Sequence, residues 1–199
     1  MIVEFVGING AGKTTVARAV AQAIDLPLHE NTTARPRGSA ARWLSRAVDL
    51  AAVPGLGFRC TARIRGGESA IVLSRLCRYE RARRSLQSGL FEEGPIQGLS
   101  IVAARDPGAV YLASYVTSPD LVVHVNTPPE VALQRIRKRD LVIDLDNMTD
   151  EHALRVLSSR AAALENVLNG VGYETLRVHG NAPVADQAQE AAQAITRKL

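Results

Sequence analysis

The feature that most constrains this chain is the run Gly7-Ile8-Asn9-Gly10-Ala11-Gly12-Lys13-Thr14, which matches GxxxxGK[ST] at each fixed position. It follows an apolar run at 2–6 that indicates a buried strand, and it precedes a helical apolar period over 13–24. In that context glycines let the backbone fold around phosphate oxygens, with amide N–H groups pointing inward at a helix N-terminus. The pattern predicts a phosphate-binding P-loop at 7–14; the alternative is a glycine turn that matches by chance.

The residue types of the P-loop also predict its ligand. Lys13 would span the β- and γ-phosphates of a nucleoside triphosphate, and the Thr14 hydroxyl would ligate Mg²⁺. We therefore expect ATP with Mg²⁺, held by Asn9, Gly10, Ala11, Gly12, Lys13, Thr14 and Thr15.

Beyond the P-loop, strand and helix patterns alternate along the chain. Strands are expected at 26–29, 89–91, 121–125 and 175–178, and helices at 129–139, 158–169 and 183–198. Between them, prolines and glycines separate short helical pieces such as 39–52, and a helical pattern returns over 68–88. Strands that alternate with helices imply a parallel sheet between two helix layers.

The composition is that of a soluble globular chain, with 46% hydrophobic and 22% charged residues. No apolar run approaches the ~20 residues of a membrane helix. The start of the chain, 1–5, lacks the basic and long apolar segments of a signal peptide. Cys60 and Cys77 have no metal-type spacing. These features predict a cytoplasmic protein with free thiols.

The basic residues are unevenly distributed. Twelve arginines lie between 31 and 84, opposed only by Asp49, Glu68 and Glu80. Because the arginine fork suits phosphate and carboxylate oxygens, this stretch either faces an anionic substrate or forms a solvated basic surface. Aromatic residues make up only 4% of the chain and none interleaves with the charge in a known motif, which argues against nucleic-acid binding.

Two segments together resemble the nucleoside and nucleoside-monophosphate kinases, particularly thymidylate and deoxynucleoside kinases. Residues 5–15 are close to the thymidylate kinase opening, with Asn9 where an aspartate is usual, and 123–139 looks like a fourth strand, a Pro-Pro-Glu helix start and an arginine-bearing lid. The resemblance implies a three-layer α/β P-loop fold whose five-stranded parallel sheet has the order 2-3-1-4-5. It implies one domain over 1–199, with a helical acceptor-side region at 31–88 and a lid at 135–150.

Basic residues of the lid segment have a chemical rationale. A phosphoryl group in transfer carries negative charge that a mobile cation stabilises, and Arg135 and Arg139 share a helical face four residues apart. The alternative is a solvated helix end. The turn at 178–183 resembles the segment that packs on adenine in this kinase group, which assigns Asn181 to ATP, although glycine and proline there also suit an ordinary turn.

Three glutamates are candidate catalytic acids. Glu92 and Glu93 end the third strand, where a P-loop sheet places an acid for water-mediated Mg²⁺ contact and where a base can accept a proton. Glu30 follows the second strand, at the position of the deoxynucleoside kinase glutamate. A general base favours a hydroxyl acceptor, whereas the arginine-rich stretch favours a phosphorylated one.

The acceptor side departs from both kinase branches. Thymidylate kinases have Asp-Arg-Tyr and deoxynucleoside kinases Glu-Arg-Ser after the third strand, where this chain has Glu93-Gly94-Pro95. In thymidylate kinases that arginine grips the acceptor phosphate, so the acceptor pocket here is rebuilt. Its candidate lining residues are Arg35, Arg37, Arg78 and Gln97.

The leading hypothesis is an ATP-dependent kinase that phosphorylates a small nucleoside-like or anionic acceptor and closes its lid to exclude water. One alternative keeps the chemistry with another acceptor hydroxyl, such as that of a sugar or an antibiotic. Another is a nucleotide-dependent switch that hydrolyses ATP slowly. The lid arginines and the Glu92-Glu93 pair favour transfer, and the chain lacks a guanine-reading Asn/Thr-Lys-x-Asp motif. The kinase resemblance also implies a homodimer.

Overall fold

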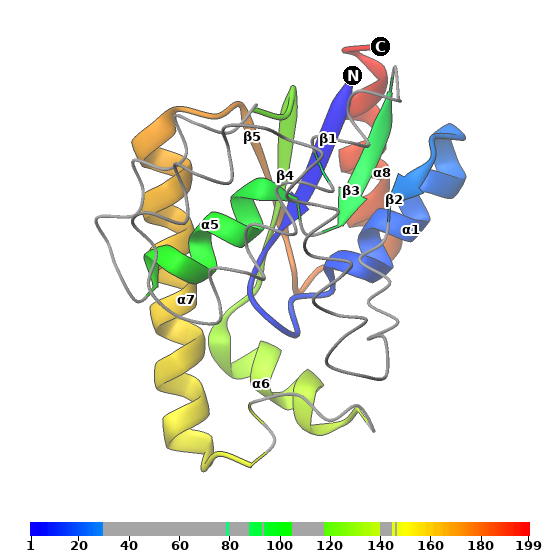
Figure 1. Ribbon diagram of the computed structural model, residues 1–199. Coiled ribbons are helices and arrows are strands. Elements are labelled where there is room, and N and C mark those ends of the chain that lie inside the picture. The colour runs from blue at the N-terminus through cyan, green and yellow to red at the C-terminus, as the bar shows by residue number, and fades with distance from the viewer. Residues whose placement is uncertain (30–78, 80–87, 93, 105–117, 140–144, 146) are drawn as a thin grey trace, which may run out of the picture.

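A computed structural model describes residues 1–29, 79, 88–92, 94–104, 118–139, 145 and 147–199 (Figure 1). Its elements, in chain order, are β1 (Ile2–Val6), α1 (Lys13–Ile24), β2 (Leu28–His29), β3 (Gly89–Glu92), α5 (Pro95–Ala103), β4 (Leu121–Asn126), α6 (Pro129–Arg137), α7 (Asp150–Val171), β5 (Thr175–His179) and α8 (Val184–Thr196). Within these described ranges, none of the helices combines the length and the apolar character that crossing a membrane requires.

The five strands form one parallel sheet in the order β2-β3-β1-β4-β5, which confirms the predicted fold class. β1 is the central strand and is buried along its whole length. It pairs with β3 on one side and β4 on the other, and the chain enters the P-loop directly after Val6. Ligands of such sheets bind outside the carboxyl ends of the strands, so the topology puts the P-loop at the expected edge.

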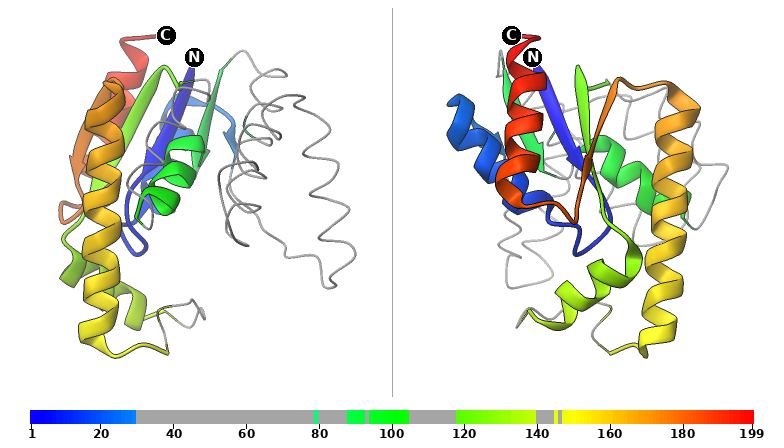
Figure 2. Two further views of the ribbon diagram at one scale, coloured as in Figure 1. Left: turned by 60° about the vertical axis from the view of Figure 1, so that its left-hand side comes forward. Right: turned by 180° about the vertical axis from the view of Figure 1, so that it is seen from behind.

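Helices cover both faces of the sheet (Figure 2). α1 packs against α8 on one face, and α5 packs against α7 on the other. The predicted apolar period of α1 is confirmed, because Val16, Ala17 and Val20 are its buried apolar residues and belong to the main core. β4 is apolar along most of its length, and Val122, Val123 and Val125 are fully buried between the two layers.

Local signals explain where most helices begin and end. α1 begins after Gly12, in the left-handed region at φ 98°, and α6 begins with a proline in its first turn, where the missing N–H costs nothing. α7 begins eight residues earlier than predicted, because the Thr149 side chain accepts a hydrogen bond from the His152 N–H and two acids follow in the first turn.

α5 was not predicted. Eight of its nine residues are buried, so it has no polar face and therefore no amphipathic period to detect. Its one local signal is the Gly94-Pro95 pair, in which proline occupies the first helical turn. A helix buried on all sides resembles a buried strand or loop when only its sequence is inspected.

The region at 31–88 lies outside the described residues except for Tyr79 and Ser88, and so do the helices expected at 39–52 and 68–88. Tyr79 is buried and meets Phe91 edge to face, with ring centroids 5.0 Å apart. Phe91 in turn stacks on His29 at 4.8 Å. Through these contacts Tyr79 packs on the β2–β3 edge of the sheet.

Candidate nucleotide-binding site

The P-loop backbone depends on two glycines for its shape. Gly10 and Gly12 have φ values of 82° and 98°, in the left-handed region that side chains rarely adopt. At Gly10 a Cβ would also lie 2.4 Å from the Ala132 carbonyl oxygen, because α6 approaches the loop closely. Gly12 has more room, since its nearest neighbour would be the Arg135 guanidinium at 3.7 Å. Gly10 and Gly12 are thus both required by their backbone conformation, and Gly10 by packing as well.

Lys13 lies inside the curve of the P-loop and is only 7% exposed. Its Nζ donates to the carbonyl oxygens of Gly7 and Ile8 at 3.0 and 3.2 Å. These carbonyls hold the ammonium group at the concave side of the loop, where the predicted phosphates would enter. Phosphate oxygens would offer it stronger, charge-assisted hydrogen bonds.

Thr14 and Glu92 meet at the carboxyl edge of the sheet. Glu92 ends β3 opposite Phe5 of β1, and the Thr14 hydroxyl donates to its Oε1 atom. A hydroxyl and a carboxylate are the hard oxygen ligands that Mg²⁺ prefers, so these residues fit the predicted metal. Within the described parts of the chain no three His, Cys, Asp or Glu residues cluster as a ready-made metal cage. Mg²⁺ here would therefore depend on phosphate oxygens and water as well.

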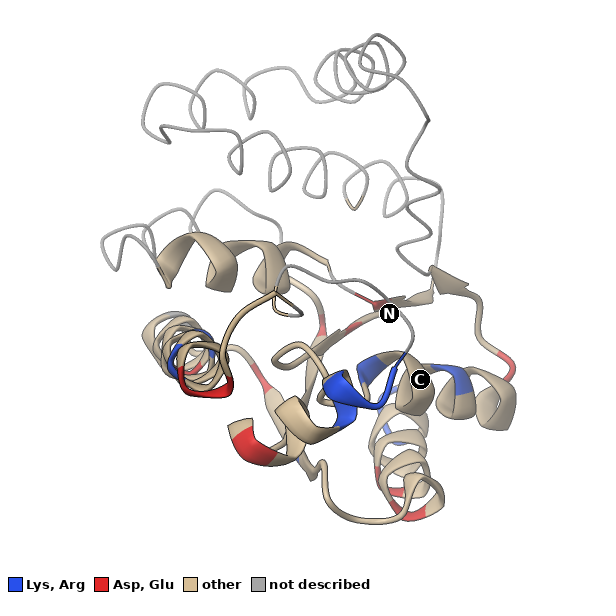
Figure 3. Ribbon diagram, turned by 90° about the horizontal axis from the view of Figure 1, so that it is seen from below, with Lys and Arg blue, Asp and Glu red and all other residues tan. Residues whose placement is uncertain are grey.

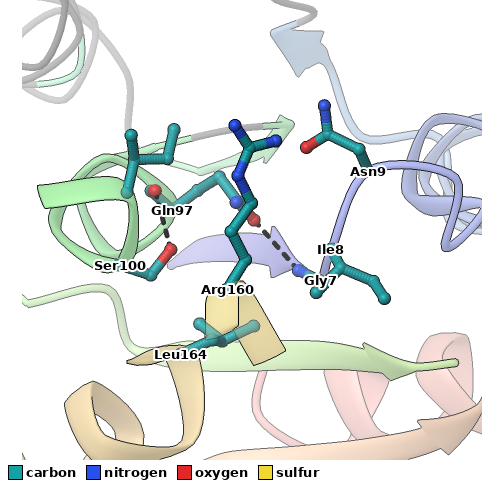
Figure 4. A pocket seen from close by; sticks show the side chains of 8 residues that line it. Gly7, Ile8, Asn9, Gln97, Ser100, Arg160 and Leu164 are labelled. Carbon is teal, nitrogen blue, oxygen red and sulfur yellow. Dashed lines mark hydrogen bonds between the residues drawn. The ribbon is translucent and has the colours of Figure 1, made fainter. Parts of the chain in front are cut away.

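The first residue of the P-loop is held from α5 by a buried side chain. The Gln97 Oε1 atom accepts a hydrogen bond from the Gly7 N–H at 3.0 Å (Figure 4). Gln97 is itself only 5% exposed. From the sequence we expected Gln97 in the acceptor pocket, and its contact with the loop backbone was not predicted.

A buried glutamate of β1 positions the start of α5. Glu4 is fully buried, and its carboxylate accepts hydrogen bonds from the N–H groups of Ile96 and Gln97 at 3.1 and 2.9 Å. A negative charge at a helix N-terminus is favourable, because the first N–H groups of a helix lack internal partners. Gly94 leaves room for this carboxylate, since a Cβ there would lie 2.7 Å from its carbon. Glu4 thereby sets the position of Gln97.

Arg135 joins the P-loop to the turn that follows β5. Its Nη1 donates to the Ala11 carbonyl at 3.1 Å, and its Nη2 donates to the Gly180 carbonyl at 2.8 Å. The Thr127 hydroxyl donates to the same Ala11 oxygen at 3.0 Å. Gly180 must be glycine, because a Cβ would lie 1.7 Å from the Thr127 Oγ1 atom. The predicted adenine turn is therefore next to the P-loop, with Asn181 exposed.

Arg137 joins the two ends of the predicted lid. Its guanidinium binds the Asp150 carboxylate at 2.9 Å and donates to the carbonyls of Leu145 and Met148 at 2.9 and 2.8 Å. The last turn of α6 is basic up to the point where the grey trace begins in Figure 3. Arg139 is exposed there, two residues past the helix. Arg135 and Arg139 thus have different surroundings, although one role was predicted for both from their spacing.

Several predicted site residues lie outside the described residues, namely Glu30, Glu93, Arg35, Arg37 and Arg78. Thr15 is described and is exposed on α1. Three supporting residues were not predicted from the sequence: Glu4, Thr127 and Gly180. Glu4 had a detectable signal, since it is the one acid in an otherwise apolar strand. The other two gave none, because their function depends on strands brought together by folding.

The sheet order and the P-loop at its carboxyl edge define the class as a three-layer α/β P-loop fold. No protein-family model matches the chain, and no curated protein sequence matches it significantly. Solved structures do match over the whole length. The chain is similar to deoxyadenosine kinase from M. mycoides with the products dCMP and a flexible dCDP, at a TM-score of 0.69 and 14% identity, over 99% of this chain and 100% of that one.

The same kinase with other ligands is also similar to this chain. With dATP the TM-score is 0.66 at 13% identity, over 98% of this chain and 100% of that chain. With dCTP it is 0.62 at 14% identity, over 99% and 100%. The TM-scores and the full coverage establish that the chain shares the fold of this kinase. Because the identities are this low, the activity has to be argued from the site.

Proposed function

We propose that this protein is an ATP-dependent kinase that transfers the γ-phosphoryl group of ATP to a nucleoside or nucleotide. The observation that carries the proposal is the convergence of Lys13, Thr14 and Glu92 at the carboxyl edge of a deoxynucleoside kinase-like sheet. A cation and a candidate metal-binding pair beside one loop suit phosphoryl transfer, which depends mainly on positioning and charge neutralisation.

On the donor side, Lys13 would exchange its two loop carbonyls for the β- and γ-phosphate oxygens. Thr14 would ligate Mg²⁺ directly and Glu92 would hold it through water. When bound, Mg²⁺ neutralises charge that develops on the phosphates. Release of the Thr14–Glu92 hydrogen bond would make both groups available. The amide N–H groups of residues 9–14 would complete the phosphate cradle.

We assign the two lid arginines different roles. Arg135 would border the adenine base, because it already binds the turn that carries Asn181. Arg139 would supply the mobile cation, since it is exposed and lies at the end of the basic segment. Arg137 would act as the anchor that links α6 to α7 while the residues between them close. Closure would exclude water from the transferred group.

For the acceptor, we propose a nucleoside hydroxyl with Glu30 or the Glu92-Glu93 pair as general base. The similar deoxyadenosine kinase carries dCMP as a product, which supports a hydroxyl acceptor. Arg35, Arg37 and Arg78 would bind polar or anionic parts of the acceptor. We also propose a cytoplasmic homodimer, to be checked by light scattering of the purified chain.

The test is an acceptor screen that follows ADP release, with Lys13→Ala as the variant. We expect turnover to fall by about 10²–10³-fold, because one preorganised charge on the transferred group is lost, and ATP binding to weaken. Lys198→Ala is the matched control, since Lys198 pairs with Glu174 on the surface at 2.6 Å. Full activity in Lys13→Ala would overturn the proposal. ADP release that is independent of every acceptor would favour a nucleotide switch instead.

A further inference from the structure

The turn that joins β5 to α8 is fixed where it begins (Figure 2). The Gly180 N–H donates to the carbonyl of Asn126, the last residue of β4, at 2.7 Å. The Gly180 carbonyl accepts from the Arg135 guanidinium at 2.8 Å, and the same guanidinium binds the Ala11 carbonyl of the P-loop. The start of the turn is therefore tied both to the sheet and to the loop.

Gln187, in the first turn of α8, fixes the other end of this turn. The Ala182 N–H donates to the His179 carbonyl at 2.9 Å, and the Ala182 carbonyl accepts from the Gln187 Nε2 atom at 2.7 Å. Asn181 lies between the two fixed residues, is exposed, and makes no hydrogen bond within the described chain. The turn thus presents one residue whose N–H, carbonyl and side-chain amide are all available.

We infer that Gln187 is a positioning residue for the donor nucleotide, because it fixes the turn on which Asn181 binds the base. The inference rests on the proposed function, which puts the phosphates of ATP in the P-loop. A nucleotide base offers hydrogen-bond donors and acceptors along its edge, and Asn181 offers both kinds. Arg135 holds the turn beside the P-loop, so a base bound there and phosphates bound in the loop can belong to one nucleotide.

The orientation of the Gln187 amide is set by its neighbour. A carbonyl oxygen can only accept, so the atom that faces the Ala182 carbonyl is the Nε2 donor. The Oε1 atom is consequently left buried and has no hydrogen-bond partner within the described chain. Pro183, next to Ala182, has no N–H to offer it. Of the two polar ends of this amide, only the one that holds the turn is used.

Stability alone does not explain a glutamine at this position. Gln187 is only 3% exposed, and the other buried residues of α8 are all apolar. A buried acceptor without a partner costs at least as much free energy as one net hydrogen bond contributes. An apolar side chain of similar length would therefore fill the same space at no loss of stability, but it would release the Ala182 carbonyl. A local cost of this kind is expected where a residue serves a functional site.

The experiment compares Gln187→Met, which keeps the length of the side chain without its donor, with Gln189→Met as the matched control. Gln189 is exposed on the same helix. Calorimetry with Mg²⁺ present measures the dissociation constants of ATP and of inorganic tripolyphosphate, which offers the P-loop a phosphate chain without a base. Thermal unfolding of each variant reports on the fold. A second variant, Gln187→Leu, repeats the comparison with a shorter side chain.

Gln187→Met should raise the dissociation constant of ATP about 3- to 10-fold, the equivalent of one net hydrogen bond. Tripolyphosphate should bind within about twofold of its wild-type affinity, since the P-loop is unchanged. The melting temperature should not fall, because the unpaired oxygen is removed together with the hydrogen bond. Gln187→Leu should give the same pattern, and Gln189→Met should match wild type in every measurement.

Three results would overturn the inference. One is that Gln187→Met binds ATP as tightly as Gln189→Met does. Another is a loss of ATP and tripolyphosphate affinity by the same factor, which would show a change in the loop and not at the base. The third is a marked fall in the melting temperature of both Gln187 variants, or their failure to fold, since the glutamine would then serve the core.

Failure of the proposed function is distinct from failure of this inference. Lys13→Ala would then leave turnover intact, whereas the comparison of ATP with tripolyphosphate in the Gln187 variants would still stand. Wild-type protein that binds neither ATP nor tripolyphosphate would overturn both.

Discussion

The two sides of the P-loop are held in different ways. Toward α6, side chains close directly on the loop: Arg135 and Thr127 both donate to the Ala11 carbonyl, and Arg135 extends to Gly180. Toward α5 and α7, the one hydrogen bond given to the loop within the described chain comes from Gln97. Among the described residues, several side chains therefore hold the loop on the α6 side, whereas one buried amide holds it on the α5 side.

The difference has a physical basis. An adenine base and the turn that packs on it require a fixed geometry. The Arg135 guanidinium fixes this geometry by binding the Ala11 and Gly180 carbonyls, and it does so at little entropic cost once α6 is folded. A transferred group changes charge and position during the reaction, so its surroundings must admit and release ligands.

The largest expected loss of stability comes from a substitution on the side of the P-loop that faces α6. Gly10→Ala adds a Cβ at 2.4 Å from the Ala132 carbonyl in addition to left-handed strain, so we expect a loss of about 3 kcal/mol in unfolding free energy and loss of ATP binding. Urea denaturation and ATP titration measure both. Gly172→Ala is the matched control: its φ is 69°, but no atom lies within 4 Å of the added Cβ. It should cost only about 1 kcal/mol. Equal losses in the two variants would contradict the close-approach argument.

An intermediate loss of stability is expected from substitutions on the side of the P-loop that faces α5. Gln97→Leu removes the acceptor of the buried Gly7 N–H, so unfolding free energy should fall by about 2 kcal/mol and ATP should bind more weakly. Gln97→Glu keeps an oxygen for that N–H but adds negative charge near the phosphates. It should therefore retain more stability and still lose ATP affinity, as measured by chemical denaturation and calorimetry. If both variants bind ATP like wild type, Gln97 does not position the loop.

The smallest expected effect is on the pH dependence of the unfolding free energy, and it comes from His124 in β4. Burial lowers the pKa of His124 below 6.5; Glu165, at 3.5 Å, acts in the opposite direction, while Arg177 and Lys13 add to the lowering. The unfolded chain then binds more protons below pH 6.5, so stability should fall as pH drops from 6.5 toward the folded pKa.

His124→Phe should reduce this slope without abolishing it, because burial also lowers the pKa of His29. Unfolding free energies at pH 7.5 and 5.5 provide the measurement. An unchanged slope in His124→Phe would show that other groups account for the acid sensitivity.

Local sequence predicted much of the fold. The apolar run of β1, the glycine motif and the period of α1 are contiguous, so the strand, loop and helix were predicted at their observed places. The strand order was predicted from the kinase resemblance and is confirmed. α5 was missed because burial on all sides removes the periodicity of its sequence. α7 was predicted to begin at 158, because its capped first turns at 150–157 were not recognised as helical.

From the amino-acid sequence we could predict the glycine-rich loop, the alternation of strands and helices, and the basic end of α6, because each is a pattern among near neighbours. The side chains that bind this loop could be identified only in the folded structure. Gln97 binds Gly7 across 90 residues, and Arg135 binds Ala11 across 124. Spacing along the chain carries no record of such contacts, since they arise when parallel strands bring their carboxyl ends to one edge.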